Sequence, residues 1–186
     1  YKENGLLLSE VEFRESRLFI KDKKFINLSN ENLQRIKEES KLLNSKILLM
    51  NNNSKIKFPL YRPALGIISS EYGVKRFIND IPRNPHLGLD IASKIGTPIY
   101  SAESGLVVLT EDFFYRGKNI LIDHSLNFKT AYSHLDEILV KEGDLVERGE
   151  IIGFMGKTGR VTGSHLHFEV IFLGERLNPI YFLSKD

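Results

Sequence analysis

The chain has 186 residues and a mass of 21.3 kDa, and its 41% apolar and 27% charged residues are typical of a globular protein. A net charge of +2 is far from the basic excess of a dedicated nucleic-acid-binding protein, so we expect no nucleic-acid partner. The absence of cysteine excludes disulfides and thiolate metal sites, which leaves histidine and carboxylate side chains as metal ligands. No apolar run approaches the ~18 residues of a membrane span, and because the first residue is Tyr1 we expect a processed or truncated product.

Two parts of the chain differ in charge and composition. Residues 1–58 carry 12 Lys and Arg against 8 Asp and Glu, whereas residues 59–186 carry 14 against 16. Between them, the turn-forming residues 51–55 are followed by Pro59 and Pro63, which disfavour regular structure. We therefore predict a linker here, which joins an N-terminal accessory segment (1–58) to a second domain (59–186).

The accessory segment is predicted to contain one helix. Ser29 is a favourable N-cap with Glu31 in the first turn, and we expect the helix over residues 30–44. Apolar residues recur near helical spacing in this region: Leu33, Ile36, Leu43 and Ile47. Such a stripe more often packs on its own protein than on a partner, so we expect the segment to lie on the second domain and to restrict access to its functional cleft. Short strand-like pieces are predicted at 11–13 and 18–20.

The second domain shows short apolar runs separated by glycine-containing turns. The runs include residues 99–100, 106–109, 120–122 and 151–154, and no helical periodicity lies between them. Turn signals at this density indicate short antiparallel strands. The predicted fold class is therefore mainly β: an antiparallel, short-stranded β domain preceded by an N-terminal segment with one α-helix.

Two histidines stand on one predicted strand. In residues 165–172, apolar side chains alternate with polar ones, as in a half-buried strand. His165 and His167 therefore project from the same face, about 6 to 7 Å apart. One of them could bind a metal while its neighbour handles a proton, but two surface histidines on an exposed face would give the same pattern.

A second pair, His86 and Asp90, needs a bend to be useful. Four residues of straight strand span roughly 13 Å, too far for two ligands of one ion, so the chain must turn at Gly88. Imidazole and carboxylate are both zinc ligands. With a third ligand from the histidine-bearing strand they would form a three-ligand site with one open position, as in catalytic zinc centres.

The remaining histidines stand alone in the sequence. If residues 130–135 form a strand, Thr130, Tyr132 and His134 share one face. A lone histidine is more often structural than catalytic. We interpret His124, which closes an apolar strand and enters a turn, as structural too.

Taken together, these motifs resemble the LytM-type (lysostaphin-like, M23) zinc metallopeptidases. The resemblance rests on HLGLDIASKIGTPIYSAESGLVV from His86, TAYSHL around His134, VKEGDLVERGEIIGFMGKTGRVTGSHLHFEV ending at Val170, and the closing LNPIYFL. It covers residues 59–183 approximately, with every motif in order. The upstream SSEYGVKRFINDIPRNPH and the preceding helix look most like the Gram-negative periplasmic branch, which cuts peptide cross-links in peptidoglycan.

The resemblance implies a Zn2+ cofactor and assigns roles to five residues. His86, Asp90 and His167 would be the zinc ligands, and His134 and His165 the two catalytic histidines. Within this scheme, His165 suits the general base and His134 the group that stabilises charge on the tetrahedral intermediate.

The sequence departs from the family pattern near these motifs. Ser164 replaces the proline that commonly precedes the His-x-His pair, and Leu87 replaces a small or polar residue. Some members use a tyrosine a few residues before the first ligand, where this chain offers only Phe77, Asn79 and Asp80. The group that stabilises the oxyanion is therefore open.

The function that the resemblance implies is zinc-dependent hydrolysis of peptide cross-links in bacterial peptidoglycan. The expected partner is then peptidoglycan with its cross-linked stem peptides, and the expected location is the periplasm or cell envelope. A regulatory protein partner stays open. The alternative is a catalytically inactive LytM-like module that binds or activates other cell-wall hydrolases, although such modules have lost zinc ligands that this chain retains.

Overall fold

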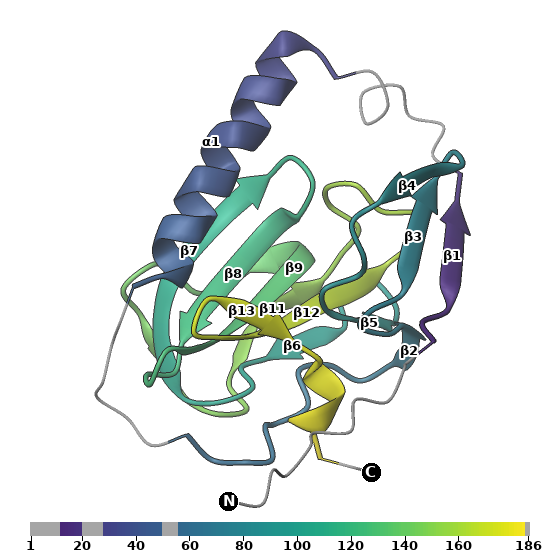
Figure 1. The fold of residues 1–186 in the computed structure, drawn as a ribbon. Coiled ribbons are helices and arrows are strands. Elements are labelled where there is room, and N and C mark those ends of the chain that lie inside the picture. Colours follow the sequence, from purple (N-terminus) through teal and green to yellow (C-terminus); the bar gives the residue numbers. More distant parts are fainter. Residues whose placement is uncertain (1–11, 20–27, 50–55, 185–186) are drawn as a thin grey trace, which may run out of the picture.

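The computed structural model describes residues 12–19, 28–49 and 56–184. They form one α-helix, one 3-10 helix and strands in two sheets (Figure 1). The predicted linker at 51–55 lies outside the described residues. No helix among the described residues is long and apolar enough to cross a membrane.

The larger sheet has ten strands, and every pairing within it is antiparallel. Its continuous path runs β10-β7-β8-β9-β12-β5-β2, while β11 pairs with β6 and β9, and β13 pairs with β12. The strands are β2 (Ile67–Ser70), β5 (Leu89–Ala92), β6 (Pro98–Tyr100), β7 (Gly105–Phe113), β8 (Gly117–Asp123), β9 (Phe128–Ile138), β10 (Leu145–Val146), β11 (Ile151–Met155), β12 (His165–Phe172) and β13 (Glu175–Leu177). A 3-10 helix, η2 (Pro179–Tyr181), follows. The predicted antiparallel β domain is confirmed.

A smaller sheet joins a strand of the accessory segment to two strands of the second domain. Its order is β1-β3-β4, with β1 (Glu15–Leu18) parallel to β3 (Lys75–Ile78) and β3 antiparallel to β4 (Ile81–Arg83). The strand-like pieces predicted at 11–13 and 18–20 are largely misplaced: β1 includes Leu18, residues 12, 13 and 19 are outside any strand, and residues 11 and 20 lie outside the described residues. Each of those pieces was judged from local apolarity alone, whereas β1 is fixed by pairing with a strand 60 residues later.

Helix α1 (Asn30–Ile47) confirms the predicted helix and extends it by three residues. Ser29 is the N-cap, and its Oγ accepts a hydrogen bond from the Asn32 N–H at 3.2 Å. Glu31 in the first turn and Lys46 in the last complement the helix dipole. Lys46 also forms an ion pair with Glu142.

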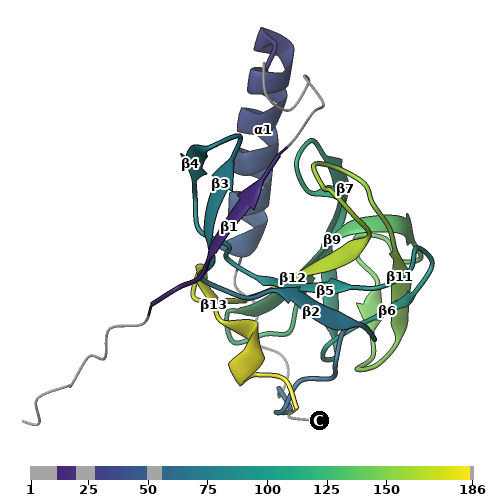
Figure 2. The same ribbon diagram turned by 90° about the vertical axis from the view of Figure 1, so that its right-hand side faces the viewer.

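The apolar contact of α1 with the large sheet comes mainly from its second half, and in the first half Arg35 donates to the Asp112 carbonyl of β7 at 2.7 Å. Leu43 and Ile47 are buried against apolar residues of the sheet that include Leu109 and Phe113, whereas Leu33 is 50% exposed. Figure 1 shows α1 along β7, with its N-terminal end projecting beyond the sheet. Figure 2 shows that the small sheet also stands above the large one. The predicted packing of the helix is confirmed. Of the predicted apolar stripe, Leu43 and Ile47 are buried, Ile36 is half-buried and Leu33 is exposed.

We predict that Leu43→Ala lowers the free energy of unfolding by about 2 to 5 kcal/mol, because it leaves a cavity under α1. Leu33→Ala, at an exposed position of the same helix, should change it by less than about 0.5 kcal/mol. Urea unfolding of both variants checks this. Equal effects would show that α1 does not depend on this contact.

The main core encloses a buried polar network around His124. Its Nδ1–H donates to the Ser104 carbonyl at 2.9 Å, and its Nε2 lies 2.7 Å from the Thr130 hydroxyl. The Thr130 hydroxyl is in turn 2.8 Å from the Tyr132 hydroxyl, which accepts from the Ala102 N–H. This network joins three segments, so the interpretation of His124 as structural fits the geometry.

Burial lowers the pKa of His124 to about 4, although the nearby Glu103 and Asp123 carboxylates oppose the shift. In the unfolded chain His124 therefore binds a proton near pH 6.5, whereas in the folded chain it binds one only near pH 4. We predict that stability falls by about 3 kcal/mol across this window because of His124, since one pKa unit corresponds to 1.36 kcal/mol. Urea unfolding at pH 7 and 4.5 should show a smaller loss for His124→Gln. Parallel pH profiles would contradict the assignment.

Candidate functional site

Strands β5 and β12 place two of the predicted ligands opposite each other. His167 pairs with Asp90 in the antiparallel register, so their side chains leave the same face of the sheet. His165 projects beside them, as its spacing from His167 predicts. The intervening Leu166 and Phe168 are buried in the core. The apolar face of β12 thus fixes the strand and orients both histidines outward.

His86 reaches this face through the bend expected at Gly88. Its backbone is held by two hydrogen bonds, from Gly73 N–H to the His86 carbonyl and from the His86 N–H to the Val74 carbonyl. A Cβ atom on Gly88 would lie 2.6 Å from His167 Cε1 and 2.7 Å from the Phe168 carbonyl oxygen. Only glycine permits this approach, which brings the first predicted ligand onto β12.

Three donor atoms converge at this point. His86 Nε2 and His167 Nδ1 lie 2.9 Å and 2.7 Å from Asp90 Oδ1, and 2.9 Å from each other. A tetrahedral zinc ion with ligands at 2.0 to 2.2 Å needs them roughly 3.3 Å apart, so a shift of a few tenths of an ångström would admit it. This donor set of two imidazoles and one carboxylate fits zinc.

The outer nitrogen of each imidazole is already committed. His86 Nδ1 lies 2.7 Å from the Glu71 carbonyl, and His167 Nε2 lies 2.9 Å from Glu169 Oε1. Each outer N–H donates to its acceptor, which leaves the lone pair of the inner nitrogen facing Asp90. Contacts of this kind orient the imidazole ligands of metal ions in proteins.

Two carboxylates in the site are ionised. Burial opposes charge on Asp90, but hydrogen bonds with His167 and His86 hold the pKa of its carboxyl well below its usual value. Its Oδ2 also accepts a hydrogen bond from Arg76 at 3.0 Å. Burial likewise opposes charge on Glu169, but the ion pair with Arg116 and the hydrogen bond with His167 lower the pKa of its carboxyl well below the usual value. The site therefore combines one anionic ligand, Asp90, and a second carboxylate, Glu169, with surrounding arginines.

His134 and His165 lie together beside the three convergent residues. Their ring centroids are 4.8 Å apart, and His165 Nε2 is 3.8 Å from Asp90 Oδ1. His134 Nδ1–H donates to the Thr158 carbonyl at 2.9 Å, and His165 Nδ1–H donates to the Gly163 carbonyl at 3.0 Å. In the neutral ring, Nε2 of each is then a free proton acceptor. All five predicted site residues are thus brought together.

The prediction that Thr130, Tyr132 and His134 share one face is confirmed for Thr130 and Tyr132, whose hydroxyls lie 2.8 Å apart, and is wrong for His134. Tyr132 packs against Phe168 in the core, with ring centroids 5.4 Å apart, whereas His134 faces His165 on the other side of the sheet. His134 has a φ of 69°, in the left-handed region that a non-glycine residue rarely adopts. This turn of the backbone redirects the side chain, and strain of this kind is often found at functional sites.

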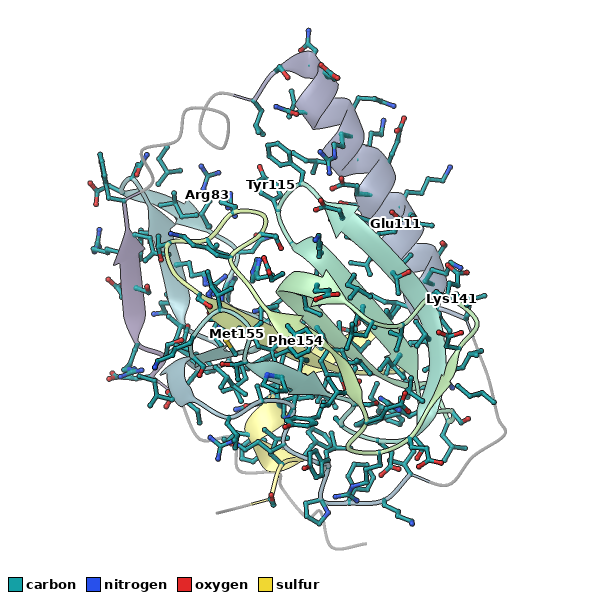
Figure 3. All side chains as sticks on the ribbon, turned by 180° about the vertical axis from the view of Figure 1, so that it is seen from behind. Arg83, Glu111, Tyr115, Lys141, Phe154 and Met155 are labelled. Carbon is teal, nitrogen blue, oxygen red and sulfur yellow. The ribbon has the colours of Figure 1, made fainter. Side chains whose placement is uncertain are left out.

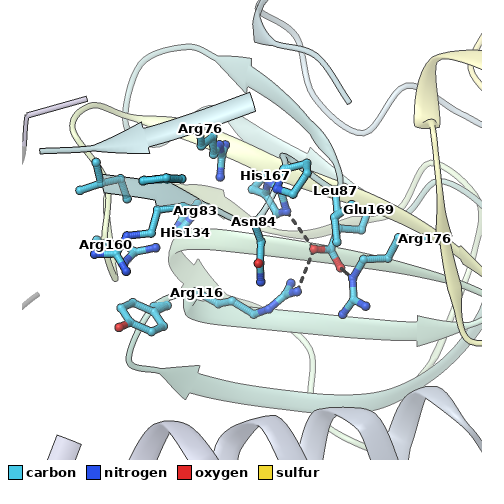
Figure 4. A pocket seen from close by; sticks show the side chains of 14 residues that line it. Arg76, Arg83, Asn84, Leu87, Arg116, His134, Arg160, His167, Glu169 and Arg176 are labelled. Atoms are coloured by element: carbon cyan, nitrogen blue, oxygen red, sulfur yellow. Dashed lines mark hydrogen bonds and ion pairs between the residues drawn. The ribbon is translucent and has the colours of Figure 1, made fainter. Parts of the chain in front are cut away.

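A cleft of about 840 Å3 opens beside the convergent residues, and His167 and His134 line it (Figure 4). Sequence reasoning missed much of its lining, namely five arginines and a tyrosine: Arg76, Arg83, Arg116, Arg160, Arg176 and Tyr115. They come from β3, β4, β13 and two turns, so no local spacing relates them. Figure 3 shows Arg83 on the small sheet and Tyr115 at the turn between β7 and β8. Phe77, Asn79 and Asp80 do not line the cleft, whereas Tyr115 does.

Helix α1 packs on the same face of the large sheet and supports one side of this cleft. The Glu39 carboxylate accepts the Phe114 N–H at 2.9 and 3.0 Å, next to Tyr115 and Arg116. The same turn is pressed onto the 156–164 loop, since a Cβ on Gly117 would lie 2.3 Å from Thr158 Oγ1. No described residue of the accessory segment lines the cleft. The expected restriction of access by that segment stays a prediction.

Comparisons with known proteins agree with this geometry. Residues 84–179, just over half of the chain, match the sequence profile of Peptidase family M23. Two proteins of Vibrio cholerae, named peptidoglycan DD-endopeptidases ShyA and ShyB, are 49% identical over 96 residues and 51% identical over 102. These matches cover 52% and 55% of this chain but 22% and 23% of the relatives.

Solved structures show the same fold. A zinc-containing peptidase from Vibrio cholerae superposes with a TM-score of 0.63 and 37% identity, over 72% of this chain and 41% of the other. The catalytic domain of lysostaphin from Staphylococcus simulans does so with a TM-score of 0.58 and 31% identity, over 64% and 93%. The chain spans about a fifth of the length of the curated relatives it matches. It belongs to peptidase family M23.

Proposed function

We propose that this chain is a zinc-dependent endopeptidase that hydrolyses peptide cross-links of bacterial peptidoglycan in the cell envelope. One observation carries the proposal: His86, Asp90 and His167 converge within hydrogen-bond distance of one another, His134 and His165 lie beside them, and the site borders a cleft lined by His134 and His167. The names of the Vibrio relatives and of the zinc-containing structure support both the substrate and the metal. An inactive module would not need three metal ligands and two further histidines in this arrangement.

His86 Nε2, Asp90 Oδ1 and His167 Nδ1 would hold the zinc ion and leave a fourth position open to the cleft. When bound, zinc lowers the pKa of water from 15.7 to about 7 and polarises a scissile carbonyl. The residues of this chain must then position the peptide, remove a proton from the attacking water and return it to the leaving nitrogen.

His165 suits the role of general base. Its Nδ1–H is committed to Gly163, so the Nε2 lone pair is free to accept the proton near Asp90. His134, one ring away, would stabilise the negative charge that develops on the substrate oxygen. Because its Nδ1–H donates to Thr158, this role requires the imidazolium form of His134, with a second proton on Nε2. Tyr115, which also lines the cleft, offers a further hydroxyl donor.

The direct test is to incubate the chain with purified cross-linked peptidoglycan, with and without a chelator, and to identify the released fragments by mass. The proposal predicts separation of cross-linked peptides that a chelator abolishes and added zinc restores. Binding of peptidoglycan without cleavage, in the zinc-loaded chain, would favour the inactive module instead.

We predict that His165→Ala lowers the rate of cleavage by about 10² to 10⁴ while the zinc content stays near that of the parent chain, since His165 moves a proton and does not bind the metal. His167→Ala should lose the zinc as well. Metal analysis and fragment release measured on the same preparations separate the two roles. Activity of His165→Ala within a few-fold of the parent would show that the base lies elsewhere.

Glu169 gives a second test, through its contact with a ligand. Glu169→Gln removes the charge that faces His167 Nε2, so we predict a zinc affinity lower by about 10- to 100-fold in titration against a competing chelator. The matched control is Glu175→Gln, which loses the same charge at an exposed position of β13 and should keep the parent affinity. Equal affinities in both variants would show that Glu169 only neutralises arginines.

A further inference from the structure

Two of the five cleft arginines have no acidic partner among the described residues. Arg76 pairs with Asp90 at 3.0 Å, and Arg116 and Arg176 pair with Glu169 at 2.8 and 3.2 Å. No ion pair of a described carboxylate reaches Arg83 or Arg160. Figure 4 shows these two on the side of the cleft away from Glu169 and Arg176. The cleft therefore carries uncompensated positive charge next to the site.

The positive charges of these arginines lie close to one another in the fold. Arg83 on β4 pairs directly with Arg76 on β3, so both project from one face of the small sheet. Like charges at directly opposed positions destabilise a strand pair. Burial lowers the pKa of Arg160, and the positive charges of Arg83 and Arg76 lower it further. Arg76 and Arg83 are direct cross-strand neighbours, and all three guanidinium groups line one cleft, where an anion would offset their positive charge.

Arg160 is also fixed in position. Its guanidinium stacks over the Tyr115 ring, 4.1 Å from the ring centroid, and its backbone N–H donates to the Tyr115 carbonyl at 3.0 Å. A guanidinium held in this way presents its fork of N–H donors in a set orientation, which suits the two oxygens of a carboxylate. Because a peptide substrate of this cleft would carry carboxylates, the fit points to the substrate itself.

We propose that Arg83 and Arg160 form a carboxylate-binding subsite, which holds a carboxylate of the peptide substrate beside the scissile bond. This inference rests on the proposed peptidase function and specifies which peptides the cleft selects. The carboxylate has two possible sources, the C-terminus of the peptide and an acidic group along it. Both present the same chemistry to the two guanidinium groups, and the substrates in the test distinguish them.

The test uses a soluble cross-linked peptide with one free C-terminal carboxylate and one internal carboxylate, together with two versions in which either group is amidated. For the parent chain we expect amidation of the recognised carboxylate to lower kcat/KM by about 10- to 100-fold, as expected for loss of hydrogen bonds to a charged group. The Arg83→Gln and Arg160→Gln variants should lose this preference.

Lys75→Gln is the matched control. Lys75 lies on the same small sheet, is exposed and does not line the cleft, so its variant loses the same charge and should keep the parent preference. Parent rates that are equal for all three peptides would overturn the subsite while leaving the peptidase function intact. A loss of preference in Lys75→Gln equal to that in the arginine variants would overturn it too, because net charge alone would then explain the effect.

Binding provides a readout that does not need cleavage. Calorimetry with the His165→Ala chain should show the free-carboxylate peptide binding about 10-fold more tightly than the amidated one, with the difference lost when Arg83→Gln is added. If no peptide is cleaved by the zinc-loaded parent, the peptidase function fails, and this measurement still decides the subsite. Equal binding of the acid and the amide contradicts it.

Discussion

A single carboxylate oxygen, Asp90 Oδ1, lies within 2.9 Å of two imidazole nitrogens that are themselves 2.9 Å apart. His86 is fully buried and Asp90 is 6% exposed, so water cannot screen these atoms. Lone pairs facing one another at this distance repel unless a proton or a cation lies between them. The convergence is therefore stable only as a site that binds a positive charge, and the surrounding structure is arranged to hold it.

Several features of the fold follow from this constraint. Glycine at position 88 allows His86 to approach β12, and Glu169 takes the outer N–H of His167. Arg76 brings the small sheet onto Asp90 through its other carboxylate oxygen. The β1 strand pairs with the strand that carries Arg76, so part of the accessory segment supports the ligand set without lining the cleft. Removing that support should loosen the carboxylate before it unfolds the core.

The cleft above the ligands is assembled from distant parts of the chain. The turn that carries Tyr115 and Arg116 is held by Glu39 of α1 and is packed closely against the 156–164 loop, which bonds to His134 through Thr158. The same loop also accepts a hydrogen bond from His165 through Gly163, so both histidines and the charged walls share these supports. Helix α1 packs on the same face of the large sheet as His167 and Glu169, so it can influence the site through this turn.

The sequence predicts those features that depend on local periodicity. Alternation along 165–172 gives the strand and the shared face of His165 and His167, and the need for a bend between His86 and Asp90 identifies Gly88. What it does not reveal depends on pairing across the chain or on single backbone angles. The positive φ of His134 reverses the face that alternation assigns to it. Arg83 and Arg160 line one cleft only because the small sheet and the loop are folded beside each other.

The central claim is that the three convergent residues bind one zinc ion that stabilises the fold, and a zinc titration of the metal-free chain tests it most directly. Calorimetry should find one zinc per chain, and the Tm should rise with zinc concentration, because a ligand that binds only the folded state stabilises it. Asp90→Ala should abolish both effects. Zinc binding that is undiminished in that variant, or binding without any rise in Tm, would contradict the account.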